Sequence, residues 1–341
     1  MPCSTGYWQQ PFVSSVAGVT RNVAALSPDD IWTLALKASA NGSTSIRRGT
    51  LLHLSGDGWR PVDLPPAPVY DMEASPSGEV WMLSAEAVWH LTGSSWVRLP
   101  LPQPSFSPGS VLPFGLDDVW VTGDVPGASG AREVWHWNGT TWSEVALPTL
   151  PRGDSIVALG GMASDDVWAI SSSPDAVQPF HWDGATWAAL PSQPITREYG
   201  SVTKIVVRAR NDAWLMVGTH LFHWDGAAWA VAPTPARSTP AGSGRWVDLA
   251  AGPSGTWFVD GAAGPHGRLD RWDGSKWVPT VPTPTDRYLS ARGSGETLRL
   301  GVVGNEVVVV HGPYQWIRRN PNGSGQMGPG AITAYVFTCG S

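Results

Sequence analysis

Five histidines occupy equivalent places in a repeated pattern, and histidine is the side chain most often used for proton transfer and metal binding. They are His53, His90, His136, His181 and His223. Each lies in a segment expected to be the third strand of its repeat. Because neighbouring strands lie about 4.8 Å apart, equivalent side chains in different repeats diverge and cannot share one ion. We therefore predict no metal site and no cofactor, and expect each histidine to hydrogen-bond within its own sheet, to an acidic turn.

Two other residues could carry acid-base chemistry, Glu73 and His266. Glu73 lies in a segment predicted to line a central channel, and His266 lies in a long connection. A lyase, hydrolase or cyclase with its active site at the mouth of the channel would use these groups together with Arg208 and Arg292. The sequence contains no G-x-S-x-G, phosphate-binding glycine loop or H-E-x-x-H motif, so an enzyme is the alternative hypothesis.

The leading hypothesis is a recognition module that binds a small molecule, a carbohydrate, a peptide or a protein. Clusters of charge beside an aromatic ring suit such ligands, although ordinary solvated loops contain them too. Acidic residues accompany the arginines, so no field of one sign results. The candidate ligand-binding residues share this mixed character; they are Arg197, Glu198, Tyr199, Arg208, Arg245, Trp246, Arg287, Tyr288 and Arg292.

The elements that must position these residues are marked by tryptophan, of which the 341-residue chain contains 21. In each repeat a turn, usually with acidic residues, precedes a first Trp, as in Asp165-Asp166-Val167-Trp168. A second turn, usually Asp-Gly or Asn-Gly, precedes a second Trp, as in Asp183-Gly184 with Trp187. Successive second Trp residues lie between 37 (Trp59 to Trp96) and 48 (Trp229 to Trp277) residues apart. A period in the low forties with this many turn signals is typical of one β-propeller blade per repeat.

We therefore predict an all-β fold, a single β-propeller of about seven four-stranded blades in one domain spanning residues 1–341, with eight blades as the alternative. The Asp-Gly turns predict type I′ hairpins between the third and fourth strands. Segments near the termini, Gly6 to Pro11 and Ala334 to Thr338, are expected to pair and close the ring. In the seventh repeat Leu298 takes the place of the first Trp. Val307 to Val310 are predicted to form the third strand in place of its usual aromatic residues.

The pattern resembles the Trp-rich propeller repeats of the form DDVWAVG followed by HWDGTTW, which occur in many bacterial proteins. The resemblance covers about residues 23 to 318 and implies the fold. It implies no particular activity, because such repeats recur in unrelated contexts and one fold hosts many functions.

The two faces of such a propeller differ in their predicted connections. Connections between strands one and two, and between three and four, share one face and are short here. The others share the opposite face and include Lys37 to Gly49, Ser192 to Gly200 and Pro233 to Arg245. Long, variable connections on a rigid scaffold are where binding usually resides, so we place the site on this long-loop face.

Charge and hydropathy argue against two classes of partner, nucleic acids and the interior of a membrane. A net charge of −6 and a pI near 5.7 provide no basic surface for phosphate backbones, so no nucleic acid partner is expected. The apolar runs are far shorter than the ~20 residues that span a bilayer, and residues 1–20 show no secretory signal pattern.

The two cysteines, Cys3 and Cys339, lie at opposite ends of the chain. A closed ring would bring them together, and a disulfide there would stabilise the fold by about 2 to 4 kcal/mol. Two free thiols in a cytoplasmic protein are the alternative, and a third interpretation makes Cys3 the first residue of a mature lipoprotein. The disulfide favours secretion or the cell surface over the cytoplasm.

Overall fold

The computed structural model describes residues 6–9, 12–38, 44–56, 58–103, 106–124, 132–148, 155–173, 176–192, 195–218, 220–234, 247–260, 268–280, 297–312, 314–319, 325–329 and 331–339. These residues form β-strands and one short 3-10 helix, η1 (Arg197–Tyr199). The chain divides into two compact units, Met1–Leu64 with Pro235–Ser341, and Pro65–Thr234. None of the described helices is long and apolar enough to span a membrane.

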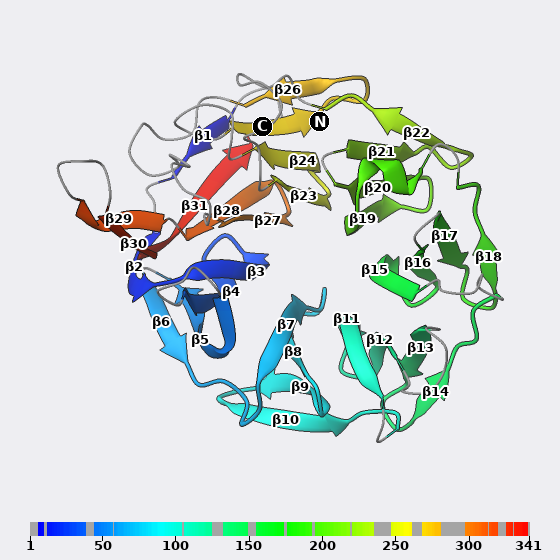
Figure 1. Cartoon of the computed structure of the whole chain (residues 1–341), viewed down its shortest axis with the longest axis horizontal. Helices are drawn as coiled ribbons and strands as arrows, with labels where there is room; N and C mark the ends of the chain where they lie inside the picture. The colour runs from blue at the N-terminus through cyan, green and yellow to red at the C-terminus, as the bar shows by residue number, and fades with distance from the viewer. Residues whose placement is uncertain are drawn as a thin grey trace. The chain divides into compact units, whose positions relative to one another are not determined.

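The unit Pro65–Thr234 contains four antiparallel sheets, each made of four strands that follow one another in the sequence (Figure 1). The first strands of neighbouring sheets contact one another in series. The sheets are β7 (Val69–Ala74), β8 (Val80–Ser84), β9 (Ala87–Thr92) and β10 (Ser95–Pro100); β11 (Ser107–Gly115), β12 (Asp118–Asp124), β13 (Arg132–Trp137) and β14 (Trp142–Glu144); β15 (Ser155–Ala163), β16 (Asp166–Ser172), β17 (Val177–Trp182) and β18 (Trp187–Ala189); and β19 (Val202–Ala209), β20 (Asp212–Val217), β21 (His220–Trp224) and β22 (Trp229–Ala232).

The other unit contains two sheets of the same kind, a third that joins the two ends of the chain, and a two-stranded sheet within residues 314–329. The regular sheets are β3 (Val19–Ser27), β4 (Asp30–Ala38), β5 (Thr44–Ser55) and β6 (Gly58–Val62); and β23 (Val247–Gly252), β24 (Gly255–Asp260), β25 (Arg268–Trp272) and β26 (Trp277–Pro279). The third sheet has the order β1-β31-β28-β27, with β2 also paired to β31. Its strands are β1 (Gly6–Trp8), β2 (Phe12–Ala17), β27 (Thr297–Val303), β28 (Glu306–Gly312) and β31 (Ala331–Cys339).

The predicted fold class is confirmed: the chain is a seven-bladed β-propeller of four-stranded antiparallel sheets, the seventh of which has β2 as an additional strand. Eight blades, the alternative, is wrong. The prediction that the terminal strands pair is also confirmed, because Gly6 lies opposite Cys339 and Trp8 opposite Phe337. That residues 1–341 form one domain stays a prediction.

The second strand of each sheet explains the repeated first Trp. Every residue of β8 and β16 is buried, as expected for a strand whose sheet packs against neighbours on both faces. The first Trp of five repeats is at most 1% exposed; these are Trp81, Trp120, Trp168, Trp214 and Trp257. Trp120 contacts Trp182 and Trp187 of the following sheet edge-on, so tryptophan fills the space between neighbouring sheets.

The strand assignment predicted for the seventh repeat is wrong. Leu298 lies in β27, the first strand, and the valine run lies in β28, the second strand. The third strand is β31, and β1 is the fourth. The second strand of this sheet contains no Trp, yet β28 is buried along almost its whole length like the other second strands. Trp316 lies in β29 (Tyr314–Arg319), which pairs only with β30 (Gly325–Pro329).

The turns between third and fourth strands also differ from the type I′ prediction. Trp182 lies opposite Trp187, and the amide of Asp183 donates to the carbonyl of Thr186 at 3.3 Å. The two central residues are therefore Gly184, with φ +96°, and Ala185. A type I′ Asp-Gly turn would instead place the glycine at the second central position. Asp183 precedes the turn, where its carboxylate accepts hydrogen bonds from the amides of Ala185 and Thr186.

One predicted long connection is mostly strand. The segment Lys37 to Gly49 was expected to be a loop, but β4 and β5 continue their ladder through the pairs Lys37 with Ser45 and Ala38 with Thr44. Much of the other long connections lies outside the described residues, as does Cys3. The disulfide between Cys3 and Cys339 therefore stays a prediction.

Candidate functional site

Four repeat histidines are hydrogen-bonded inside their own sheets, as predicted. The ring nitrogen Nε2 lies 2.8 Å from the aspartate at the start of the second strand for His53 (Asp30) and His136 (Asp118), 2.7 Å for His181 (Asp166) and 3.1 Å for His223 (Asp212). The same aspartate oxygen accepts the indole N–H of the first Trp in three of these sheets, from Trp32, Trp168 and Trp214. These contacts join the second and third strands of each sheet.

The fifth histidine, His90, has a different neighbourhood. Its Nδ1 lies 3.1 Å from the hydroxyl of Thr92. Burial lowers the pKa of His90, and the charge of Glu79 opposes that shift only in part. Within the described part of the chain, no group of three or more His, Cys, Asp or Glu side chains could hold a metal ion.

Arg208, a predicted ligand-binding residue, is engaged by its own sheet. Its Nε lies 3.1 Å from Oδ2 of Asp212, and its side chain is 40% exposed. Burial raises the pKa of Asp212, but the hydrogen bond from His223 and the charge of Arg208 outweigh it and hold that pKa below its ordinary value. The guanidinium therefore stabilises a carboxylate that His223 and Trp214 already share.

Glu198 and Tyr199 lie side by side in η1, in a short segment before β19 that we call the 195–200 turn. The Tyr199 ring centroid lies 4.6 Å from that of His220 and 5.2 Å from that of Phe222. Ile195 is 3% exposed, and backbone hydrogen bonds run from Ile195 to Ser192 and from Tyr199 to Thr196. Glu198 is exposed. This turn therefore presents a carboxylate from a backbone fixed by buried neighbours.

Apart from Arg197, the other predicted residues lie in different elements or outside the described residues. Glu73 lies in β7 and is half-buried. Arg197 is described only as part of η1. Six candidates lie outside the described residues: Arg245, Trp246, His266, Arg287, Tyr288 and Arg292.

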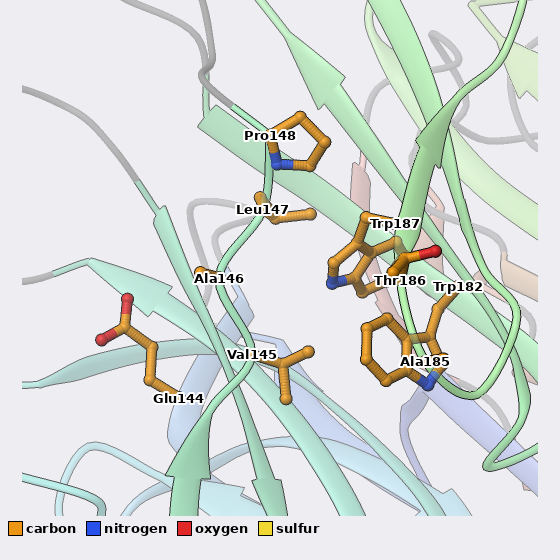
Figure 2. A pocket seen from close by; sticks show the side chains of 9 residues that line it. All are labelled: Glu144, Val145, Ala146, Leu147, Pro148, Trp182, Ala185, Thr186 and Trp187. Atoms are coloured by element: carbon orange, nitrogen blue, oxygen red, sulfur yellow. The ribbon is translucent and has the colours of Figure 1, made fainter.

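A pocket of about 490 Å³ lies between two neighbouring sheets, where the sequence predicted no site (Figure 2). One wall is the 144–148 segment, which is the end of β14 and the residues that follow it. The other wall comes from the next sheet, where Trp182 ends β17 and Trp187 begins β18. The lining residues are Glu144, Val145, Ala146, Leu147, Pro148, Trp182, Ala185, Thr186 and Trp187.

The indole nitrogen of Trp187 points toward the 144–148 segment, whereas that of Trp182 points away from it (Figure 2). Trp187 is 9% exposed, and its buried Nε1 has no hydrogen-bond partner. Sequence reasoning missed this pocket because its residues belong to the regular repeat. Nothing in the spacing of Trp182 and Trp187 distinguishes them from the other tryptophan pairs.

Comparison with known proteins shows the fold. No family model matches the chain, and no curated protein matches it. Among solved structures, the chain is similar to YCF48 bound to D1 peptide, with 16% identity, a TM-score of 0.60 and 96% of each chain covered. It is also similar to the Dos1 propeller (12% identity, TM-score 0.56, 98% of this chain and 95% of that chain covered). The Cps50 (Swd1) β-propeller domain of Myceliophteria thermophila matches with 10% identity and a TM-score of 0.56, over 97% of this chain and 99% of that one.

Proposed function

We propose that this chain is a recognition module that binds a carbohydrate, peptide or protein through the connections between its sheets. The observation that carries this proposal is a contrast between polar side chains that bond within a sheet and polar side chains that are exposed in a connection. Four repeat histidines and their aspartates hydrogen-bond to each other within sheets, and Arg208 is paired with Asp212. The 195–200 turn instead exposes Glu198 beside the half-buried Tyr199.

The geometry of the 195–200 turn suits binding. Because Tyr199 packs on His220 and Phe222, little conformational freedom remains for a ligand to remove, and a site that is already ordered binds more tightly. An exposed carboxylate beside an aromatic ring can accept hydrogen bonds from hydroxyl or amide groups while the ring contacts an apolar face. YCF48 is similar in fold and is described bound to a peptide, which is compatible with this proposal.

Glycan and peptide arrays probed with the wild-type chain and with Glu198→Gln and Tyr199→Ala test the proposal. We expect ligands that bind the wild type and bind both variants at least about fivefold more weakly, as loss of one hydrogen bond to a charged group predicts. Glu86→Gln is the matched control, because Glu86 is also exposed but lies in another sheet, between β8 and β9. Turnover of a substrate by the wild type, with no array ligand, would contradict it.

A further inference from the structure

The structure contains its own example of how the second Trp of a repeat binds polypeptide. The indole Nε1 of Trp142, at the start of β14, donates to the carbonyl of Pro100 at 2.8 Å. The equivalent Nε1 of Trp59, in β6, donates to the carbonyl of Phe12 at 2.9 Å. In both cases the acceptor is a main-chain carbonyl of an edge strand in another sheet, β10 for Trp142 and β2 for Trp59.

Trp187 occupies the same position in its own sheet but makes no such bond. Trp182 lies opposite Trp187 as Trp137 lies opposite Trp142, so the two indoles are equivalent in register. The Nε1 of Trp187 is nonetheless buried without an acceptor, although an unpaired buried donor is unfavourable. The space next to it is the pocket bounded by Leu147 and Pro148. Trp187 therefore holds a buried, unpaired hydrogen-bond donor next to this pocket.

We propose that this pocket binds an extended, proline-containing peptide whose main-chain carbonyl accepts the indole N–H of Trp187. The precedent is Pro100, which accepts the Trp142 N–H within the sequence Leu99-Pro100-Leu101-Pro102. A proline-rich segment adopts the polyproline II conformation before binding, leaves its carbonyls unpaired, and docks in grooves lined by aromatic rings.

The lining of the pocket matches this ligand. Val145, Leu147, Pro148 and the ring of Trp182 provide apolar surface for pyrrolidine rings. Glu144 is exposed, and its side chain extends from the 144–148 segment away from the two indoles, whereas Val145 and Leu147 extend toward them (Figure 2). A sugar with many hydroxyl groups would find few polar partners here, because the polar side-chain groups of the lining are Glu144, Thr186 and the Trp187 N–H.

The test uses the full chain and the synthetic peptide acetyl-Leu-Pro-Leu-Pro-Lys-amide, titrated by calorimetry. We expect saturable one-to-one binding that weakens about five- to tenfold in Trp187→Phe, which keeps an aromatic ring and removes the N–H. The peptide acetyl-Leu-Ala-Leu-Ala-Lys-amide should bind at least fivefold more weakly.

Trp229→Phe is the matched control, because the buried Nε1 of Trp229 also has no partner but Trp229 does not line this pocket. It should bind the peptide like the wild type, and thermal unfolding of both Phe variants checks that they fold. Equal affinity of the wild type and Trp187→Phe would overturn the proposal, as would binding of monosaccharides but not of the peptide. Glu198→Gln should leave peptide affinity unchanged, so this proposal and the proposed function fail separately.

Discussion

The fourth and seventh sheets reach the same four-stranded architecture by different routes. The sheet β15–β18 uses one continuous repeat, and a tight turn at Gly184 attaches its fourth strand. The sheet β27–β28–β31–β1 takes its fourth strand from the other end of the chain. In the fourth sheet Asp166 binds both His181 and Trp168, whereas in the seventh the second strand is a valine run that ends in the buried His311. Similar architecture therefore does not require the same stabilising contacts.

The largest effect is expected from removing the tryptophan of the second strand in the fourth sheet, which the second strand of the seventh sheet lacks. Trp168 is 1% exposed and contacts Trp224 and Trp229 of the following sheet. Trp168→Ala should lower the free energy of unfolding by about 3 to 5 kcal/mol, because a large cavity opens between sheets. Urea denaturation measures this, and a loss below about 1 kcal/mol would show that the tryptophan contacts matter little.

The seventh sheet should depend instead on a covalent link between its terminal strands. We expect Cys339→Ser to lower the free energy of unfolding by about 2 to 4 kcal/mol under oxidising conditions, because the predicted bond to Cys3 restricts the unfolded chain. Under reducing conditions the wild type and the variant should unfold alike. A free-thiol assay on the unfolded wild type that finds two thiols without reductant would refute the link.

His311 gives the seventh sheet a pH dependence of its own. Burial lowers the pKa of His311 from 6.5 to about 4. Between these two pH values the histidine is therefore protonated in the unfolded chain and neutral in the folded chain. Stability from this group is complete above pH 6.5 and is lost as the pH falls toward 4, by about 3 kcal/mol in total. His311→Leu should remove this part of the pH dependence, measured by denaturation at pH 7.5 and 4.5. Asp212, whose pKa is also lowered, is present in both proteins, so equal slopes would contradict the prediction.

The smallest effect concerns the turn that attaches the fourth strand in the fourth sheet. Gly184→Ala places a side chain at φ +96° with its Cβ 2.9 Å from Cβ of Asp165. The expected loss is about 1 to 2 kcal/mol, because a left-handed backbone is unfavourable for residues with a Cβ. Ala185→Ser, at the next position of the same turn, is the control and should change the melting temperature very little.

The sequence predicts what the repeat encodes and fails where the repeat is interrupted. Trp168, Trp182 and Trp187 mark β16, β17 and β18 correctly. The acidic turn before the first Trp also supplies the predicted histidine partner, as Asp166 does for His181. The strand assignment predicted for the seventh sheet is wrong because Leu298 was aligned with the missing Trp of the second strand. The second strand is β28, which shares burial, but no tryptophan, with the other second strands.

The candidate sites depend on contacts between sheets, which cannot be predicted from the repeat motif of a single sheet. The indole N–H of Trp142 donates to the carbonyl of Pro100, whereas that of Trp187 is buried next to a pocket with no acceptor. The two tryptophans are equivalent in the sequence. The engagement of Arg208 by Asp212 likewise arises from the turn between β19 and β20 and could not be separated from an exposed arginine.

The pairing of Gly6 with Cys339 has a consequence for synthesis on the ribosome. While the chain is still emerging, β28 has an unpaired edge that β31 will later cover, and β1 has no partner. Six sheets can form in the order of translation, but the seventh must wait for β31 (Ala331–Cys339). Folding should therefore end with a late step that joins residues more than 300 positions apart, such as Gln9 with Thr338, and chains cut before Ala331 should arrest with that edge open.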